Sequence, residues 1–232
     1  MKPVTMELGG HNAALVFDDV DVDAVAASAV SGKFRNAGQI CTSPTRFYVQ
    51  APVFDAFLEA FRAGAAALKV GSGFEPETQM GPLVSRRRLD AMQALVDDAI
   101  ATGAALATGG KCRDGQGYFF APTILTDVND GARFLTDEPF GPVASVAPFE
   151  TFDEGVALAS HDSLGLASYV HAVDPDIAQR AAEALESGVV GVNTFAVSRP
   201  ELPFGGIKDS GYGREGGREG LLEFLVAKVV AR

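Results

Sequence analysis

The first segment with chemical potential spans residues 34–41, FRNAGQIC, and ends on Cys41. A helical pattern precedes it and a strand-like run follows it, so Gly38 marks a turn that can leave the Cys41 sulfur exposed as a nucleophile. Backbone N–H groups in such a turn can hold an oxyanion and lower the pKa of the thiol. A lone cysteine can equally serve as a small buried hydrophobic residue. Residue type and position therefore leave both interpretations of Cys41 open.

The second segment is MELGG at residues 6–10, which contains Glu7. A glutamate followed by Gly9 and Gly10 has little tendency to form a helix or a strand, so it predicts a turn where the backbone passes close to another group. A carboxylate there can act as a general base if partial burial raises its pKa towards neutrality. Taken alone, the segment is also compatible with a purely structural turn.

Two further motifs follow in the chain, EPFGP at 138–142 and PFGGIKDSG at 203–211. With ELGG at 7–10 and GQIC at 38–41, they resemble, in the same order, four active-site motifs of the aldehyde dehydrogenase superfamily. The separation of the glutamate from the cysteine, 34 positions, also matches that family. The resemblance covers nearly the whole chain and implies the catalytic domain of such an enzyme.

This resemblance implies a reaction sequence. Cys41 attacks an aldehyde carbon to give a thiohemiacetal, which becomes a thioester after hydride transfer to NAD or NADP. Glu7 then activates the water that hydrolyses the thioester to the acid. Glu215 resembles a residue proposed to relay protons from that base, although an acid at this place can instead face the dipole of a helix in its first turn.

The resemblance also implies binding roles. Glu138 is expected to bind the nicotinamide ribose, Phe140 to pack against the nicotinamide and Gly9 to lie against the cofactor. Phe204 is expected in the wall of the substrate funnel. Glu138 as an ordinary solvated loop carboxylate is the alternative. The choice between NAD and NADP stays open, because the residues that make it lie upstream of the Glu motif in the family.

Arg35 suggests a substrate class, because it lies six residues before Cys41. Succinate-semialdehyde dehydrogenases carry an arginine at this place that binds the distal carboxylate of the substrate, and Ser198 lies where they have a second carboxylate contact. A guanidinium suits a carboxylate because it can bind both oxygens. Capping of a helix C-terminus, or pairing with a surface acid, is the alternative for Arg35. Some relatives carry a redox-active second cysteine where this chain has Ser43, so no such switch is expected.

The resemblance further implies that most of the cofactor-binding half of the family is not in this chain. We therefore expect a catalytic part that forms no NADH or NADPH by itself. The alternative is a non-catalytic or assembly module with at most residual thiol esterase activity. The sequence does not distinguish a fragment from a shortened gene product, and it does not fix the aldehyde.

Composition limits the other classes of function. The 232 residues carry a formal net charge of −11, which disfavours nucleic-acid binding because phosphate contacts dominate that affinity. The basic run 86–88 is expected to begin a solvated helix. Two cysteines imply no disulfide framework, and with no signal-peptide pattern or long apolar run they favour a cytoplasmic protein that does not enter a membrane. The three histidines share no metal-ligand spacing, and the acidic run 18–23 lacks the pattern of a calcium loop, so no metal is expected.

Strand-like runs alternate with helical patterns, which predicts an α/β fold with a mostly parallel twisted sheet flanked by helices. Strands are expected at 13–17, 46–50, 143–149, 167–173 and 189–192. Helices are expected at 24–34, 53–68, 89–100, 152–160 and 177–185, the first of them capped by Asp23.

Three parts are expected along the chain: residues 1–10 as the end of the cofactor domain, 11–210 as the catalytic domain, and 211–232 as a C-terminal helix and oligomerisation strand. The apolar run 224–230 is that strand. Because an edge strand needs a partner, it favours a homo-oligomer, a dimer or a tetramer.

Overall fold

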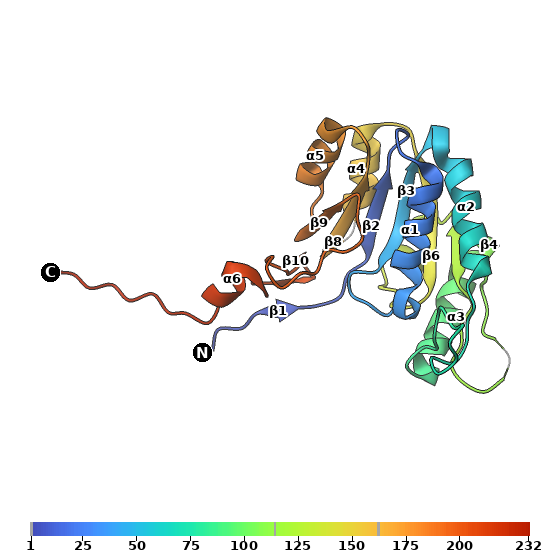
Figure 1. The fold of residues 1–232 in the computed structure, drawn as a ribbon, viewed down its shortest axis with the longest axis horizontal. Coiled ribbons are helices and arrows are strands. Elements are labelled where there is room, and N and C mark those ends of the chain that lie inside the picture. The colour runs from blue at the N-terminus through green and yellow to red at the C-terminus, as the bar shows by residue number, and fades with distance from the viewer. Residues whose placement is uncertain (1, 114, 162) are drawn as a thin grey trace.

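The computed structural model describes residues 2–113, 115–161 and 163–232. Its centre is a seven-stranded sheet made of β2 (Asn12–Val16), β3 (Pro44–Gln50), β4 (Ala105–Thr108), β5 (Thr123–Thr126), β6 (Val143–Phe149), β8 (Ala167–His171) and β9 (Val189–Val192). The strand order is β4-β5-β6-β3-β2-β8-β9, and every neighbouring pair is parallel except β4 and β5 (Figure 1). This confirms the predicted fold class.

Helices cover both faces of the sheet (Figure 1). They are α1 (Val22–Phe34), α2 (Phe54–Ala67), α3 (Arg86–Ala101), α4 (Phe152–Ser160) and α5 (Pro175–Ala184). One apolar core joins the sheet to α1, α2 and α3, and a second joins it to α4 and α5. All five residues of β2 are buried, as expected for a central parallel strand covered on both faces.

Several predicted bounds are those of the structure, including β6, β9 and α4. The predicted cap of the first helix is wrong by two residues. Asp21, not Asp23, is the N-cap of α1, and its carboxylate accepts a hydrogen bond from the N–H of Ala24 at 3.1 Å. Three aspartates alternate in this run, and the one whose backbone is extended takes the cap, because the N-cap residue itself is not helical.

Two short strand pairs lie apart from the main sheet. β1 (Met6–Glu7) pairs with β11 (Gly211–Tyr212), and β7 (Leu164–Gly165) pairs with β10 (Ile207–Lys208). The expectation that Glu7 lies in a turn is therefore wrong, since it lies in β1. Strands of two residues leave no periodic pattern, so neither pairing could be predicted.

Near the C-terminus the chain forms α6 (Gly217–Leu222). The residues after α6 extend away from the body of the molecule (Figure 1). The run 224–230, expected as a strand that pairs with another subunit, is irregular in the single chain, and Phe224 and Val226 are 87% and 92% exposed. A strand forms only where a partner accepts its hydrogen bonds, and the chain brings none to this segment. None of the helices in the described residues has the length and apolarity to cross a bilayer.

Candidate active site

The candidate residues gather at the amino ends of the parallel strands. Cys41 lies three residues before β3, Gly10 two residues before β2, and Gly141 two residues before β6. Open α/β sheets usually bind ligands at the carboxyl ends of their strands. Here the loops that enter the strands, rather than those that leave them, carry the chemistry.

The turn before Cys41 has an unusual backbone. Asn36, Ala37 and Gly38 have φ values of 52°, 54° and 69°, all in the left-handed region. For residues other than glycine this conformation costs about 1–3 kcal/mol, and it persists only where surrounding contacts impose it. The turn leaves Cys41 partly exposed, which is compatible with a nucleophile and differs from a fully buried hydrophobic residue.

Glu7 and Cys41 are neighbours in the folded chain. The Glu7 carboxylate hydrogen-bonds the Cys41 thiol, and burial together with the charge of Glu7 raises the pKa of that thiol to about 11. The N–H of Thr42 acts in the opposite direction but is outweighed, so the expected lowering of the thiol pKa by the turn is wrong. At neutral pH the sulfur is therefore a thiol with a carboxylate in place to accept its proton.

The second oxygen of that carboxylate is free for another proton. Glu7 Oε1 is buried and has no hydrogen-bond partner among the described residues. A buried acceptor without a partner is costly, so its presence in a native site points to a group that arrives later, such as a water or a reacting molecule. Glu7 can thus serve the sulfur with one oxygen and water with the other.

The raised pKa has a direct consequence for thiol alkylation. Only the thiolate reacts, so the rate at which iodoacetamide labels Cys41 should rise about tenfold per pH unit up to a midpoint near 11. Replacement of Glu7 by Gln removes a negative charge beside the sulfur and should move the midpoint to lower pH. The measurement is the labelling rate at a series of pH values. An unchanged midpoint in E7Q would contradict the contact between Glu7 and Cys41.

Glu138 is a second carboxyl group in this region, since its charge also acts on the Cys41 thiol. Its Oε1 accepts a hydrogen bond from the N–H of Gly10 at 3.0 Å, and a Cβ on Gly9 would overlap its Oε2. Burial raises the pKa of the Glu138 carboxyl, and the positive charges of Arg88 and Lys33 oppose that rise. Glu138 is therefore not an ordinary solvated loop carboxylate.

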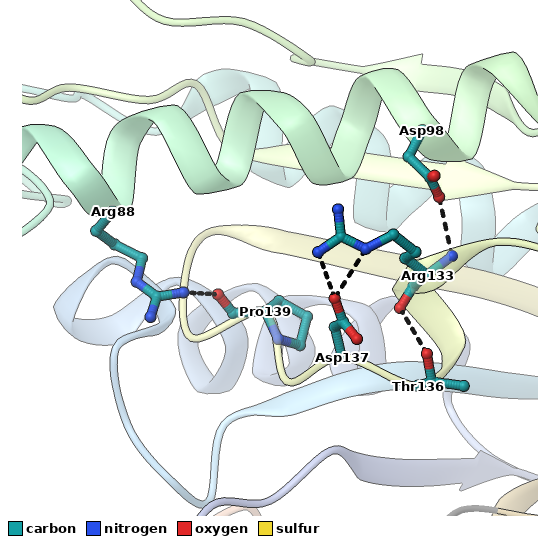
Figure 2. A network of polar contacts seen from close by, with 6 residues as sticks. All are labelled: Arg88, Asp98, Arg133, Thr136, Asp137 and Pro139. Carbon is teal, nitrogen blue, oxygen red and sulfur yellow. Dashed lines mark hydrogen bonds and ion pairs between the residues drawn. The ribbon is translucent and has the colours of Figure 1, made fainter.

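The loop that carries Glu138 is fixed to α3 and to itself (Figure 2). Arg88 of α3 donates to the carbonyl oxygen of Pro139 at 3.0 Å, and Arg133 pairs with Asp137 at 2.6 Å. Asp98 of α3 accepts a hydrogen bond from the N–H of Arg133 at 2.9 Å. The expectation that the run 86–88 begins a helix is confirmed, and its last residue also holds this loop.

Phe140 has a φ of 43°, and the Arg88 guanidinium lies 5.9 Å from the centre of its ring. Left-handed backbone is uncommon for a bulky residue and marks a position that its surroundings hold in place. The phenyl ring is half-buried, so part of its surface is free to contact a ligand.

The Cys41 and Glu138 motifs pack against each other. A Cβ on Gly38 would overlap the carbonyl oxygen of Gly141, so this approach requires a glycine. Beneath the contact lies Lys33, which is fully buried and donates to the hydroxyl of Ser43 at 3.3 Å. Burial lowers the pKa of Lys33 to about 7, although the charge of Glu138 opposes this. Lys33 was not predicted from the sequence. The one signal that could have found it is the position of this cation beside Phe34, at the end of an apolar helix.

Arg35 was expected either to bind a substrate or to cap a helix, and its place in the structure is compatible with both. Its backbone N–H bonds the carbonyl oxygen of Ser31 and caps α1, while Arg35 also lines a cavity of about 280 Å³ together with Thr42 and Phe195. Ser198 is exposed and lies two residues beyond Ala196, the last residue of its segment that lines the cavity. The structure therefore brings Arg35 close to the cysteine loop and leaves Ser198 outside the cavity.

Phe204 and Glu215 contact each other rather than Cys41. Their backbones exchange two hydrogen bonds of 2.7 Å, and the Glu215 side chain is exposed. Glu215 precedes Gly216, the N-cap of α6, so the alternative of a first-turn acid is wrong and Glu219 takes that place. The contacts recorded for the described residues bring neither Phe204 nor Glu215 to the Glu7 carboxylate.

The residues of the Glu138 loop and of the Glu7 segment fit one end of a nicotinamide dinucleotide. Glu138 offers a carboxylate to ribose hydroxyls, Gly9 lets that carboxylate approach the backbone because a Cβ would overlap Oε2, and Phe140 offers a half-exposed ring. Among the described residues no cluster of three or more His, Cys, Asp or Glu side chains could hold a metal ion.

Taken together, a mostly parallel sheet covered on both faces and a partly exposed thiol beside a carboxylate define an α/β protein with a candidate nucleophile and base. The chain belongs to the aldehyde dehydrogenase family, since the model described as "Aldehyde dehydrogenase family" matches residues 1–230. Enzymes of this family are NAD(P)-dependent oxidoreductases.

Individual relatives agree with this assignment. The chain is 45% identical to the mitochondrial succinate-semialdehyde dehydrogenase of Rattus norvegicus over 99% of its own length and 44% of that protein. It is also 45% identical to the 4-(hydroxymethyl)benzenesulfonate dehydrogenase TsaD1 of Comamonas testosteroni, over 98% of the chain and 47% of that protein. A betaine aldehyde dehydrogenase of Staphylococcus aureus, solved in complex with NAD+, superposes with a TM-score of 0.93 at 39% identity, over 97% of this chain and 45% of that one. The chain thus spans about half the length of these relatives.

Proposed function

We propose that this chain supplies the nucleophile and the base for oxidation of an aldehyde to an acid. The observation that carries the proposal is the hydrogen bond between the Cys41 thiol and the Glu7 carboxylate at a partly exposed sulfur. As the sulfur bonds to the aldehyde carbon, the thiol proton passes to Glu7 and the carbonyl oxygen becomes an oxyanion. The backbone N–H of Cys41 is the donor that we propose for that oxygen, since the N–H groups of Gln39 and Ser43 are already bonded within the turn.

A nicotinamide dinucleotide, when bound, supplies the hydride acceptor that oxidises the thiohemiacetal to a thioester. Glu138, Phe140 and Gly9 are the residues we propose to hold its nicotinamide ribose end. The proposal covers NAD and NADP alike. Before the second half of the reaction, Glu7 releases the thiol proton to solvent. It then takes a proton from water, the water oxygen bonds to the thioester carbon, and the C–S bond breaks to release the acid, while the proton on Glu7 returns to the sulfur and restores the Cys41 thiol.

A test of this function needs no cofactor. An activated ester such as 4-nitrophenyl acetate transfers its acetyl group to a nucleophilic thiol and releases coloured nitrophenolate. We expect the 232-residue chain to release nitrophenolate faster than buffer and to carry the acetyl group on Cys41. A chain that is never acylated at Cys41 would instead be the non-catalytic module.

The substrate we propose is an aldehyde with an anionic group at its far end, such as succinate semialdehyde. Arg35 lines the cavity beside the cysteine loop and offers a guanidinium to that anion. Two of the three relatives above are named for compounds with a carboxylate or a sulfonate, both anions, and the third is named for betaine aldehyde. Ser198 is a further proposed contact, and it reaches the anion only if the segment 195–198 moves towards the cavity.

Replacement of Arg35 by Ala should reduce discrimination between charged and neutral acyl groups. We expect the ratio of acylation rates for 4-nitrophenyl hemisuccinate and 4-nitrophenyl butyrate to fall about tenfold or more, because a hydrogen bond to a charged group is worth ~1.5–3 kcal/mol. Arg62 in α2 is exposed and paired with Glu59, so R62A has the same change of net charge and serves as the control. An equal effect of both variants would show that bulk charge, not a binding site, sets the ratio.

The proposal also covers the domains of the chain, its assembly with other subunits and its cellular compartment. We propose that residues 1–10 belong to a cofactor domain, that 11–210 form the catalytic domain, and that 211–232 pair with another subunit of a dimer or tetramer. The exposed apolar side chains of 221–230 support the last point. Two free cysteines suit a reducing compartment such as the cytoplasm. Glu215 remains a proposed proton relay that would act through an intervening water.

A further inference from the structure

The three peptide carbonyls of the nucleophile segment, residues 41–43, are all held by buried side chains from the sheet. The side-chain amide of Asn12 donates to the carbonyl oxygens of Cys41 and Ser43 at 2.7 and 2.8 Å. The hydroxyl of Tyr169 donates to the carbonyl oxygen of Thr42 at 2.5 Å. Asn12 is 2% exposed and Tyr169 is fully buried, so no water competes for these bonds.

A third hydrogen bond fixes the orientation of the Asn12 amide. Its Oδ1 accepts from the N–H of Ala167 at 3.1 Å, at the start of β8. A flipped amide would place N–H₂ against an N–H donor and oxygen against two carbonyls, which excludes the other orientation. Gly10 leaves the necessary space, because a Cβ there would lie 2.6 Å from Asn12 Oδ1 and 2.7 Å from the Cys41 oxygen.

The direction of one peptide group follows from this clamp. In a planar trans peptide the C=O and the N–H point in opposite directions. Since Asn12 holds the carbonyl of Cys41 towards the sheet, the N–H of Thr42 points the other way, and it donates to the Cys41 sulfur. The next N–H along the chain, that of Ser43, is already bonded to the carbonyl oxygen of Ile40 at 2.9 Å.

We propose that Asn12 is a positioning residue for the nucleophile: it fixes the Cys41–Thr42 peptide so that the Thr42 N–H faces the sulfur. The inference rests on the proposed function only in that it takes Cys41 as the nucleophile. A single backbone donor then stabilises the thiolate in an environment where burial and Glu7 oppose ionisation. Asn12 does this from inside the sheet, without contact with a substrate.

The test is the pH dependence of Cys41 alkylation by iodoacetamide. Asn12→Leu has nearly the same size and no donor. It should raise the midpoint and slow labelling at a fixed pH by about tenfold or more, because a hydrogen bond to a charged group is lost. The comparison is best made in the E7Q background, where the midpoint lies at lower pH. Tyr169→Phe is the matched control: it frees the Thr42 carbonyl, which belongs to the next peptide, and should leave the midpoint unchanged.

Cys112 gives an internal reference in the same chain. Cleavage after arginine places Cys41 on the peptide 36–46 and Cys112 on the peptide 89–113, so both rates are read from one sample. If N12L fails to fold, both cysteines react alike, and the smaller Asn12→Ala decides instead. An unchanged Cys41 midpoint in a folded N12L or N12A chain would overturn the proposal, as would an equal shift in Y169F. Failure of the proposed function looks different, because it is seen as absence of acylation in the unaltered chain.

Discussion

Replacement of Cys41 by Ser is expected to reduce nitrophenolate release from 4-nitrophenyl acetate to the rate in buffer. A serine hydroxyl is a far weaker acid than a thiol, and the environment that raises the pKa of the Cys41 thiol to about 11 opposes ionisation of a hydroxyl as well. Removal of the nucleophile from an acyl-transfer site costs on the order of 10⁶ in kcat. The measurement is the initial rate of nitrophenolate release at equal chain concentration.

Cys112→Ser is the natural control for this experiment. Cys112 is half-buried and donates a hydrogen bond to Gln93 of α3, whereas Arg88 of the same helix bonds the Glu138 loop. Its replacement should leave ester cleavage unchanged. Loss of activity in C112S, or full activity in C41S, would assign the reaction to a different group.

Replacement of Glu7 by Gln should separate the two halves of the reaction. Loss of the general base slows hydrolysis of the thioester by about 10²–10⁴-fold. Acylation loses Glu7 as its proton acceptor, but loss of the negative charge beside the sulfur also lowers the pKa of the thiol and leaves more thiolate at a given pH, which offsets that loss. We therefore expect one rapid equivalent of nitrophenolate per chain, followed by very slow turnover. Stopped-flow absorbance measures both phases.

Glu75→Gln serves as the control for charge, since Glu75 is exposed in the connection between α2 and α3. It should behave as the unaltered chain does. Equal steady-state rates for E7Q and the unaltered chain would remove Glu7 from the hydrolytic step.

The fold could be predicted where the periodic pattern is long. β6, α4 and β9 have the predicted bounds because apolar runs and a Thr151 capping box mark them locally. The pairing of β1 with β11 could not be predicted, because it joins two residues near each end of the chain by tertiary contact alone. The strand expected at 224–230 stays a prediction, since its strand propensity needs a partner and the segment is irregular in the single chain.

The residues of the candidate site could be predicted from motifs, but the pKa shifts within it could not. Cys41 and Glu7 could be paired from the sequence, but burial reversed the expected direction of the thiol pKa. Lys33 and Asn12 were missed because each stands at the edge of an apolar segment, where a polar residue looks like the start of a loop. Both are buried, and a polar residue in a buried run needs a partner, so that position is the signal that could have found them.

The most direct measurement is the mass of the acyl adduct in E7Q and in the unaltered chain after the ester is removed. Each chain is treated with 4-nitrophenyl acetate, desalted, cleaved after arginine and followed over time by mass spectrometry. We predict one acetyl group on the peptide 36–46, which disappears with time from the unaltered chain and persists in E7Q. An acetyl group on the peptide 89–113, on neither peptide, or lost equally fast from both chains would contradict a thioester at Cys41 that Glu7 helps to hydrolyse.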